Sequence, residues 1–429
     1  LPIPDPALVV LIGPAGAGKS TLAARHFRPT EVVSSDACRA LVADDPNDQA
    51  ATGRAFALVE RIVELRLAGG RTTVVDATNV RPEERAPWVR LARDHDLPRV
   101  AVVLDLPEEE CLRRSPGRPG REDVPARAIG RQHKTMRRHA EGLAKEGFGT
   151  VHVLRSAAEV DAARLIRVPR PGDLPHLRGP FDLIGDVHGC LPELVTLLTR
   201  LGWVIARDGR ERAVGARHPE GRTAVFVGDL VDRGPDSPGV VELVAGMRAS
   251  GDALCVVGNH EDKLARALAG RNVRRGHGLE LTLEQLAERE AAEPGFTDRV
   301  RAFLAELPDH LRLAGGELVV AHAGLPERYH GRTSRRARAH ALYGATTGGR
   351  DEYGLPVRLP WAEDHRGAAE VVYGHTPVLR ARWVNRTICL DTGCVFGGEL
   401  TALRWPEREV VSVPAEREWC APVRPLAEG

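Results

Sequence analysis

Two groups of residues in this chain could handle phosphate, and the reactions expected of them run in opposite directions. Residues 13–20 read GPAGAGKS and fit the nucleotide-binding pattern G-x-x-x-x-G-K-[ST]. Farther along, Asp, His and Asn recur in five short motifs, at 186–188, 228–229, 258–260, 322 and 374–375. Such side chains can hold two metal ions for phosphate-ester hydrolysis. The first group would therefore add phosphate to an acceptor, and the second would remove it.

In the first group, Lys19 is expected to reach the β- and γ-phosphates of ATP or another nucleoside triphosphate, and Ser20 to bind its Mg²⁺. The motif follows an apolar stretch and opens a helix, whose N-terminus adds free N–H donors. The rest of the predicted nucleotide-binding set is Gly13, Gly16, Gly18 and Thr21. This site would be a kinase if a general base accompanies it.

Asp36 is the candidate for that base, because it follows the second apolar stretch and could take the proton of an acceptor hydroxyl. It could equally cap the helix that begins there. Arg39, one helical turn on, could hold an acceptor phosphate. Asp76 and Asn79, after the third apolar stretch, form a polar cluster expected to contact the nucleotide or the water around its metal.

A lid is expected to supply further positive charge to the nucleotide. Arginines crowd a Pro- and Gly-containing link between two helices, at positions 113, 114, 118 and 121. Arg118 and Arg121 are our choice for nucleotide binding, where they would neutralise charge on the transferred phosphoryl group.

In the second group, one carboxylate must bridge two ions that lie about 3.5–4 Å apart. Asp229 is the candidate. The remaining ligands are assigned to a first ion (Asp186 and His188) and to a second ion (Asn259, His322 and His375). Mixed His, carboxylate and Asn ligands favour Mn²⁺, Fe or Zn²⁺ over Ca²⁺, and Ni²⁺ is a further alternative.

Three more residues complete the hydrolytic site. His260 follows the ligand Asn259 and could protonate the leaving oxygen. Asp232 could orient that imidazole, and Arg233 could hold the phosphate with two parallel N–H donors. Asp391 also looks close to the site, without a role that we can name.

Composition agrees with an ordinary globular protein of two or three domains. The chain has 429 residues, 42% of them apolar, and a net charge of +1. Its seven cysteines are scattered and form no C-x-x-C pair, which argues against a zinc site and favours a reducing, cytoplasmic setting. No apolar run is long enough to cross a membrane.

Alternating apolar strands and helical stretches predict an α/β fold. In residues 1–170 the expected strands are 7–12, 31–34, 72–75, 100–105 and 151–154, with helices at 52–67 and 82–94. That order predicts a parallel sheet with flanking helices. After the Pro/Gly/Arg-rich boundary at 168–173, residues 171–429 add strands at 181–184, 224–227, 253–257, 318–321, 371–373, 387–390, 400–405 and 410–413, and a helical insert within 261–308.

These motifs resemble two known families. The segments 185–189, 228–234, 258–261, 321–323, 374–377 and 390–398 look like the calcineurin-like metallophosphoesterases, which implies an α/β sandwich. Residues 13–20 with 34–39 resemble polynucleotide 5′-kinases. In this order, the two parts resemble the bacterial polynucleotide kinase-phosphatases that heal RNA ends.

The resemblance implies two activities. One is ATP-dependent phosphorylation of a 5′-hydroxyl end, with Mg²⁺; the other is Mn²⁺-dependent removal of a 2′,3′-cyclic phosphate or of a 2′- or 3′-phosphate. The implied partners are RNA ends (DNA ends being the alternative), a ligase domain or protein and a Hen-type RNA 3′-end methyltransferase. No membrane partner is expected, and a homo-oligomer stays open. Because none of the four Lys lies in a K-x-D-G motif, the chain is expected not to seal RNA by itself.

Two other readings of the sequence remain. The same hydrolytic motifs occur in Ser/Thr protein phosphatases, so the chain could join such a phosphatase to a small-molecule P-loop kinase. A scaffold with an inactive, phosphate-sensing site is the third, and the intact Lys19, Asp36 and metal-ligand set argue against it.

Overall fold

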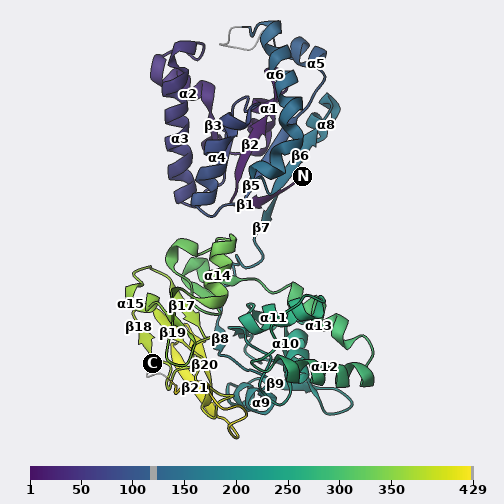
Figure 1. The fold of residues 1–429 in the computed structure, drawn as a ribbon, viewed down its shortest axis with the longest axis vertical. Helices are drawn as coiled ribbons and strands as arrows, with labels where there is room; N and C mark the ends of the chain where they lie inside the picture. Colours follow the sequence, from purple (N-terminus) through teal and green to yellow (C-terminus); the bar gives the residue numbers. More distant parts are fainter. Residues whose placement is uncertain (116–122, 427–429) are drawn as a thin grey trace. The chain divides into compact units, whose positions relative to one another are not determined.

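The computed structural model describes residues 1–115 and 123–426, so Arg118 and Arg121 lie outside the described residues (Figure 1). The chain divides into two compact units. The first comprises Leu1–Arg170 with Arg332–Ser334, and the second Pro171–Gly331 with Arg335–Gly429. In the described residues, no helix is both long and apolar enough to cross a membrane.

The first unit is built on a parallel five-stranded sheet in the order β3-β4-β2-β5-β6. Its strands are β2 (Leu8–Ile12), β3 (Val32–Ser34), β4 (Thr73–Asp76), β5 (Arg99–Leu104) and β6 (Thr150–Leu154). Its helices are α1 (Lys19–His26), α2 (Ser35–Ala43), α3 (Thr52–Ala68), α4 (Pro82–Asp94), α5 (Glu108–Arg114), α6 (Ala126–His139), α7 (Leu143–Glu146) and α8 (Ala157–Ala162). The parallel sheet predicted from the apolar stretches is confirmed.

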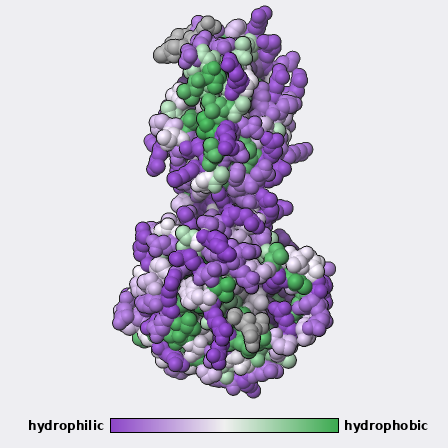
Figure 2. Space-filling model, turned by 90° about the vertical axis from the view of Figure 1, so that its left-hand side faces the viewer, coloured by the Kyte–Doolittle hydropathy of each residue, from purple (hydrophilic) through white to green (hydrophobic). Residues whose placement is uncertain are grey.

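The side chains of β2 point alternately to the two faces of the sheet, and helices cover both faces. Leu8, Val10 and Ile12 pack into a core with α3 and α4, whereas Val9 and Leu11 pack into another with α1. Successive strand side chains point to opposite faces, so a strand buried on both sides reads as a continuous apolar run. Some apolar side chains stay outside: Leu41 of α2 and Leu65 of α3 are exposed, and Figure 2 shows apolar surface on this unit.

The second unit is a sandwich of two five-stranded sheets, ordered β12-β11-β8-β20-β21 and β13-β14-β17-β19-β18. The strands of the first sheet are β8 (Phe181–Ile184), β11 (Thr223–Phe226), β12 (Ala253–Cys255), β20 (Glu399–Trp405) and β21 (Glu409–Pro414). Those of the second are β13 (His310–Leu313), β14 (Leu318–Ala321), β17 (Glu370–Tyr373), β18 (Trp383–Val384) and β19 (Thr387–Cys389). Leu183, Val320 and Val372 belong to one buried cluster, so the inner faces of both sheets share a core.

Helices cover the outer faces of the sandwich. They are α9 (Leu191–Arg200), α10 (Ser237–Ala249), α11 (Asn259–Leu268), α12 (Leu279–Ala292), α13 (Phe296–Ala305), α14 (Arg335–Tyr343) and α15 (Trp361–Asp364). Three of these, α11 to α13, form the helical segment predicted within 261–308. The α/β sandwich is therefore confirmed.

Three strand pairs were not predicted. They are β1 (Pro2–Asp5) with β7 (Ile166–Pro169), β9 (Val204–Arg207) with β10 (Ala213–Arg217), and β15 (Thr346–Arg350) with β16 (Pro356–Arg358). All are short two-stranded pairs, and β15 is exposed along its whole length. They lack the continuous apolar character that marks a buried strand.

Candidate active sites

The nucleotide-binding loop lies between β2 and α1, as the motif requires. Gly18 is the N-cap of α1, with φ 93°, and Gly16 has φ 81°. A Cβ at Gly16 would lie 2.1 Å from the Cys111 carbonyl oxygen, so only glycine fits there. Gly13 is also tightly packed, since a Cβ there would lie 3.1 Å from the Leu104 carbonyl oxygen. The loop backbone is thereby held at the N-terminus of α1, where phosphate oxygens can meet free N–H groups.

Lys19 and Ser20 begin α1, and both side chains are held by hydrogen bonds. Lys19 Nζ donates to the carbonyl oxygens of Gly13 and Pro14 at 2.9 and 2.8 Å. Ser20 Oγ donates to Asp76 Oδ2 at 2.7 Å. A hydroxyl beside a carboxylate is a donor pair for Mg²⁺. Thr21 follows in the first turn of α1 and is exposed.

Asp76 and Asn79 do not form one polar cluster in the structure. Asp76 faces the loop through Ser20, in keeping with a contact near the metal. Asn79 is buried; its amide donates to the Leu11 carbonyl oxygen at 2.8 Å and its Oδ1 accepts from Trp88 at 3.1 Å. Asn79 thus supports the core, and the expectation that it contacts the nucleotide is wrong.

Asp36 lies in the first turn of α2 and is paired with Arg39. Ser34 is the N-cap of this helix, and its Oγ accepts from Ala37 N at 3.4 Å, so the reading of Asp36 as the cap is wrong. Arg39 Nη1 donates to Asp36 Oδ1 at 2.7 Å and to the Pro46 carbonyl oxygen at 2.9 Å. The buried guanidinium fixes the carboxylate, which stays partly exposed. This arrangement suits a base that meets its acceptor from solvent.

Arg114 is the lid arginine that the described residues place at the loop. A Cβ at Gly18 would lie 4.0 Å from Arg114 Nη1, which is buried and has no hydrogen-bond partner within residues 1–115 and 123–426. Arg113 is exposed and contacts Glu110, to which Arg114 Nε also lies at 3.8 Å. A buried guanidinium nitrogen without an acceptor is suited to a phosphate oxygen.

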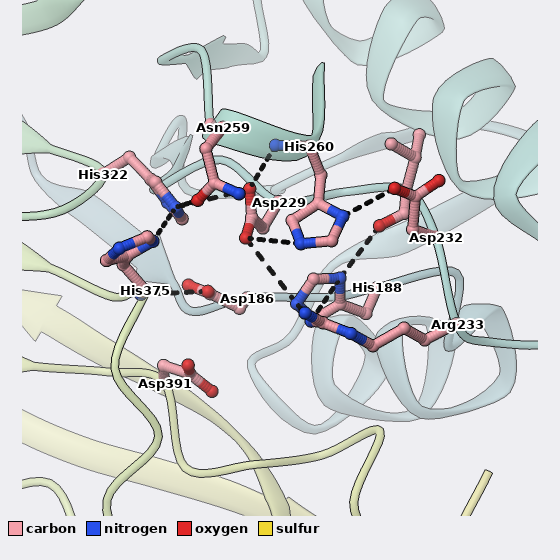
Figure 3. Close-up of polar contacts among 12 residues, drawn as sticks. Asp186, His188, Asp229, Asp232, Arg233, Asn259, His260, His322, His375 and Asp391 are labelled. Atoms are coloured by element: carbon pink, nitrogen blue, oxygen red, sulfur yellow. Dashed lines mark hydrogen bonds and ion pairs between the residues drawn. The ribbon is translucent and has the colours of Figure 1, made fainter. Parts of the chain in front are cut away.

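The hydrolytic site lies at the carboxyl ends of six strands of the second unit (Figure 3). Asp186, Asp229, Asn259, His322, His375 and Asp391 come one to four positions after β8, β11, β12, β14, β17 and β19, and His188 follows Asp186. The structure therefore brings together all the residues assigned to the two ions. Their side chains converge on Asp229, and four of them line a cavity of ≈ 390 Å³ together with Asp391, Arg233 and His260.

Asp229 occupies the centre of this cluster. Its Oδ1 lies 3.3 Å from His322 Nε2, and its Oδ2 lies 3.6 Å from His188 Nε2. His322 Nε2 also lies 3.0 Å from Asn259 Oδ1 and 2.9 Å from His375 Nδ1. Each oxygen of Asp229 thus faces a different subset of ligands, as a bridging carboxylate must.

Backbone carbonyls fix the tautomers of two histidines. His188 Nδ1 lies 2.8 Å from the Val231 carbonyl oxygen, and His322 Nδ1 lies 3.1 Å from that of Val227. Each Nδ1 therefore carries the proton, and each Nε2 lone pair points into the site. Burial and the Arg233 cation hold the pKa of His188 well below its usual range, so its imidazole is neutral, as a metal ligand requires.

A donor set with this geometry fits two divalent ions. Asp186 Oδ1 is buried without a hydrogen-bond partner in the described chain, while its Oδ2 accepts from His375 N at 3.0 Å. Burial, and then the charges of Asp391 and Asp229, raise the pKa of Asp186 well above its ordinary value. Crowded carboxylates of this kind need positive charge beside them.

Several of these residues have strained backbones. His188, Asp229, Asp232, Arg233 and His375 all adopt positive φ, between 46° and 75°. Non-glycine residues in this region cost roughly 1–3 kcal/mol each and concentrate at functional sites. The fold therefore bears strain at the positions assigned to metal binding and phosphate binding.

The predicted acid and its orienting carboxylate are paired as expected. His260 Nδ1 lies 2.6 Å from Asp232 Oδ2, and His260 Nε2 lies 3.8 Å from Asp229 Oδ2. Arg233 reaches the same region, with Nη1 2.5 Å from His188 Nε2. His260 can therefore face a leaving oxygen at the metal site, and Arg233 can face a phosphate.

Glu261 and Arg358 also belong to this site, and neither had a role assigned from the sequence. Glu261 is fully buried, and its carboxylate accepts from the backbone N–H groups of Gly258, Asp229 and Leu230 at 2.8–2.9 Å. Arg358, at the end of β16, contacts His375 Nε2 and adds a cation to the cavity wall. The spacing of Glu261 from Gly258 is that of a carboxylate that binds N–H groups at a helix start, whereas no sequence signal marks Arg358.

Comparison with known proteins divides the chain in the same way. Residues 8–143 match the AAA domain family, and residues 179–391 match the calcineurin-like phosphoesterases. The chain is 45% identical to the bis(5′-nucleosyl)-tetraphosphatase PrpE [asymmetrical] of Anoxybacillus flavithermus over 245 residues, which cover 56% of this chain and 96% of that protein. It is also 45% identical to the PrpE of Bacillus subtilis over 236 residues, covering 55% and 94%. A crystal structure titled as a putative diadenosine tetraphosphatase is 28% identical, covers 57% of this chain and 96% of that chain, and has a TM-score of 0.40.

Proposed function

Because this chain belongs to the calcineurin-like phosphoesterases and carries an AAA-type P-loop domain before them, we propose that it heals polynucleotide ends. The kinase site would phosphorylate a 5′-hydroxyl, and the phosphoesterase site would remove a 2′,3′-cyclic phosphate or a terminal 2′- or 3′-phosphate. The observation that carries the proposal is the pairing of Asp36 with Arg39 in the unit that holds the P-loop. That pair supplies a base for a hydroxyl acceptor, and the same chain also carries the set of hydrolytic residues.

At the kinase site, the chain's own groups would orient and deprotonate the acceptor. Asp36 would accept the proton of the 5′-hydroxyl, and Arg39 would hold its carboxylate in place. Lys19 would turn from the loop carbonyls to the phosphates of the bound nucleotide. Mg²⁺, when bound at Ser20 and Asp76, supplies charge neutralisation for the phosphates.

At the hydrolytic site, two divalent ions, when bound, supply Lewis-acid activation of the phosphate and of the attacking water. The ligands would be Asp186 and His188 for one ion, Asn259, His322 and His375 for the other, and Asp229 for both. Arg233 would hold the phosphate oxygens. His260, oriented by Asp232, would give a proton to the leaving hydroxyl of the ribose.

A single pair of variants tests the two-site proposal. With the full chain, radiolabelled ATP and a 5′-hydroxyl RNA, Asp36→Asn is expected to abolish 5′ phosphorylation and to leave release of a 3′-phosphate unchanged. Asp229→Asn is expected to do the reverse. The matched controls are exposed aspartates outside both sites, Asp94→Asn and Asp298→Asn. Loss of both activities in Asp36→Asn would refute independent sites.

A second candidate substrate comes from the relatives. Proteins named as asymmetrical bis(5′-nucleosyl)-tetraphosphatases share 45% identity with this chain over nearly their whole length. The hydrolytic site would then cleave a phosphoanhydride of a dinucleoside tetraphosphate. Competition between a 3′-phosphorylated RNA and diadenosine tetraphosphate for wild-type protein distinguishes the candidates, because the preferred substrate has the larger kcat/KM.

The products of the two proposed reactions would be the substrates of a joining reaction. The healed ends would be a 5′-phosphate and a 3′-hydroxyl, which a ligase consumes, and the ligase and the methyltransferase would be its partners. The chain alone is proposed not to join ends. A sealed product from ATP, healed RNA and this chain would contradict that.

A further inference from the structure

A second group of side chains that could hold a metal ion lies close in sequence to the hydrolytic residues. Cys190, Glu193 and Cys394 present two Sγ atoms and a carboxylate oxygen that all lie within 4.8 Å of one another. Cys190 is the N-cap of α9, Glu193 is in its first turn, and Cys394 lies in the loop after β19. All three are at most 2% exposed. None of them takes part in the reactions proposed above.

Only one of the two carboxylate oxygens of Glu193 accepts hydrogen bonds in the described residues. Its Oε1 accepts from Glu416 N at 3.0 Å and from the Trp419 indole at 2.8 Å. Its Oε2 is buried and has no hydrogen-bond partner among residues 1–115 and 123–426. A buried carboxylate oxygen without a donor is costly, so this atom points to a cation.

The two thiols belong to the same small volume. Contact with the Cys190 thiol, followed by burial, raises the pKa of the Cys394 thiol above its ordinary range. A divalent ion that binds two such sulfurs displaces both protons to solvent.

We propose that Cys190, Glu193 and Cys394 bind one thiophilic divalent ion, of which Zn²⁺ is the fitting member. Two thiolates and a carboxylate suit Zn²⁺ better than Mn²⁺ or Mg²⁺, which prefer oxygen ligands. The bound cluster would carry a net charge of −1 at the N-terminus of α9, where the helix dipole stabilises negative charge. The fourth ligand of a tetrahedral ion would be water.

The position of the ion gives it a structural role. Cys190 is two residues from the ligand His188, and Cys394 is three residues from Asp391. An ion held by both sulfurs would tie the first catalytic loop to the loop after β19. It would also fix Glu193, which anchors the segment at Glu416 and Trp419.

Cobalt spectroscopy tests this site with the full chain. Metal-free, reduced protein is titrated with Co²⁺, and near-ultraviolet absorption is recorded. The catalytic ligands are oxygen and nitrogen atoms, so a thiolate-to-Co²⁺ charge-transfer band reports the cysteine cluster alone. We expect the absorbance of the band to correspond to one Co²⁺ ion bound per chain. The band should disappear on addition of Zn²⁺ and be absent in Cys190→Ser and Cys394→Ser. Cys420→Ser, a nearby half-exposed cysteine outside the cluster, is expected to keep it.

Native mass spectrometry supplies a count that is independent of activity. Three ions are expected on wild-type protein and two on Cys394→Ser. The proposal is overturned if folded wild-type protein binds two ions and shows no thiolate band. It is equally overturned if both folded serine variants keep the band. Because the first outcome is read on wild-type protein, it does not depend on how well the variants fold.

Discussion

His260 Nδ1 lies 2.6 Å from Asp232 Oδ2, and Thr282 from α12 donates to the other oxygen of the same carboxylate at 2.6 Å. Asp232 N also donates to Ser237 Oγ at 3.1 Å. Asp232 is therefore held by two further elements, its carboxylate by α12 and its backbone by α10. This network leaves His260 Nε2 as the atom that faces the metal site.

Asp232→Asn should lower kcat for a ribose 3′-phosphate by about 10- to 100-fold, because the amide no longer stabilises the protonated imidazole. An activated aryl phosphate, whose leaving group needs no proton, should lose much less. The measurement is kcat for both substrates with saturating Mn²⁺. Asp298→Asn is the matched control, and equal losses on the two substrates would contradict a role through proton donation.

Glu261→Gln should weaken metal binding by about 10- to 100-fold, as is usual when a group that supports metal ligands is changed. An amide offers one acceptor oxygen, whereas Glu261 accepts N–H groups with both oxygens and so holds the Asp229 loop. Calorimetric titration with Mn²⁺ measures the change. The exposed Glu284→Gln is the control, and unchanged affinity in a folded Glu261→Gln variant would show that the loop holds its shape without this carboxylate.

Arg114→Ala should reduce the kinase kcat/KM for ATP by at least about tenfold, because a guanidinium that stabilises charge on a transferred phosphoryl group is lost. Arg113→Ala, one residue away, exposed and paired with Glu110, should leave it nearly unchanged. Steady-state phosphorylation of a 5′-hydroxyl RNA measures both. Similar losses in the two variants would indicate a general charge effect of the lid.

The framework of both units could be predicted from apolar runs, because parallel strands buried on both faces leave an unbroken apolar signature. Leu8–Ile12 is wholly apolar and wholly buried and was found for that reason. The β1–β7 pair was missed: Pro2–Asp5 and Ile166–Pro169 are short, partly exposed and separated by more than 150 residues. Pairing of that kind depends on tertiary packing rather than on local pattern.

The residues of the functional sites also divide into those marked by the local sequence and those that only the tertiary fold brings into place. Asp229 and His322 stand directly after apolar strands, so their types and positions were informative. Thr282, Glu261 and Arg358 act through contacts that only the fold creates. Thr282 lies near the start of a charged helix and was indistinguishable there from a surface residue, although it is 1% exposed. Asn79 shows the converse error, since a polar residue at a strand end turned out to support the core.

A buried ion pair outside both sites contributes to the stability of the second unit. Asp182 is fully buried, and accepts from Arg222 Nε at 2.8 Å and from the Trp203 indole at 2.9 Å. Arg222 also pairs with Glu407, whose side chain is 46% exposed. Asp182→Asn should lower the free energy of unfolding by about 3–5 kcal/mol, because the Arg222 charge stays buried without its buried partner. Glu407→Gln should cost less than about 1 kcal/mol, since solvent screens the exposed partner.

The contribution of Glu407 to stability should depend on pH. The hydrogen bond from Arg222 lowers the pKa of Glu407 to about 2. A carboxyl whose folded-state pKa is depressed stabilises the protein above its ordinary value of 4.5, and this stabilisation is lost as pH falls toward about 2. Urea denaturation of wild-type protein and Glu407→Gln should therefore show a small difference at pH 7 that shrinks below about pH 4.5. A difference that grew on acidification would show that Glu407 is not the ionised partner of Arg222.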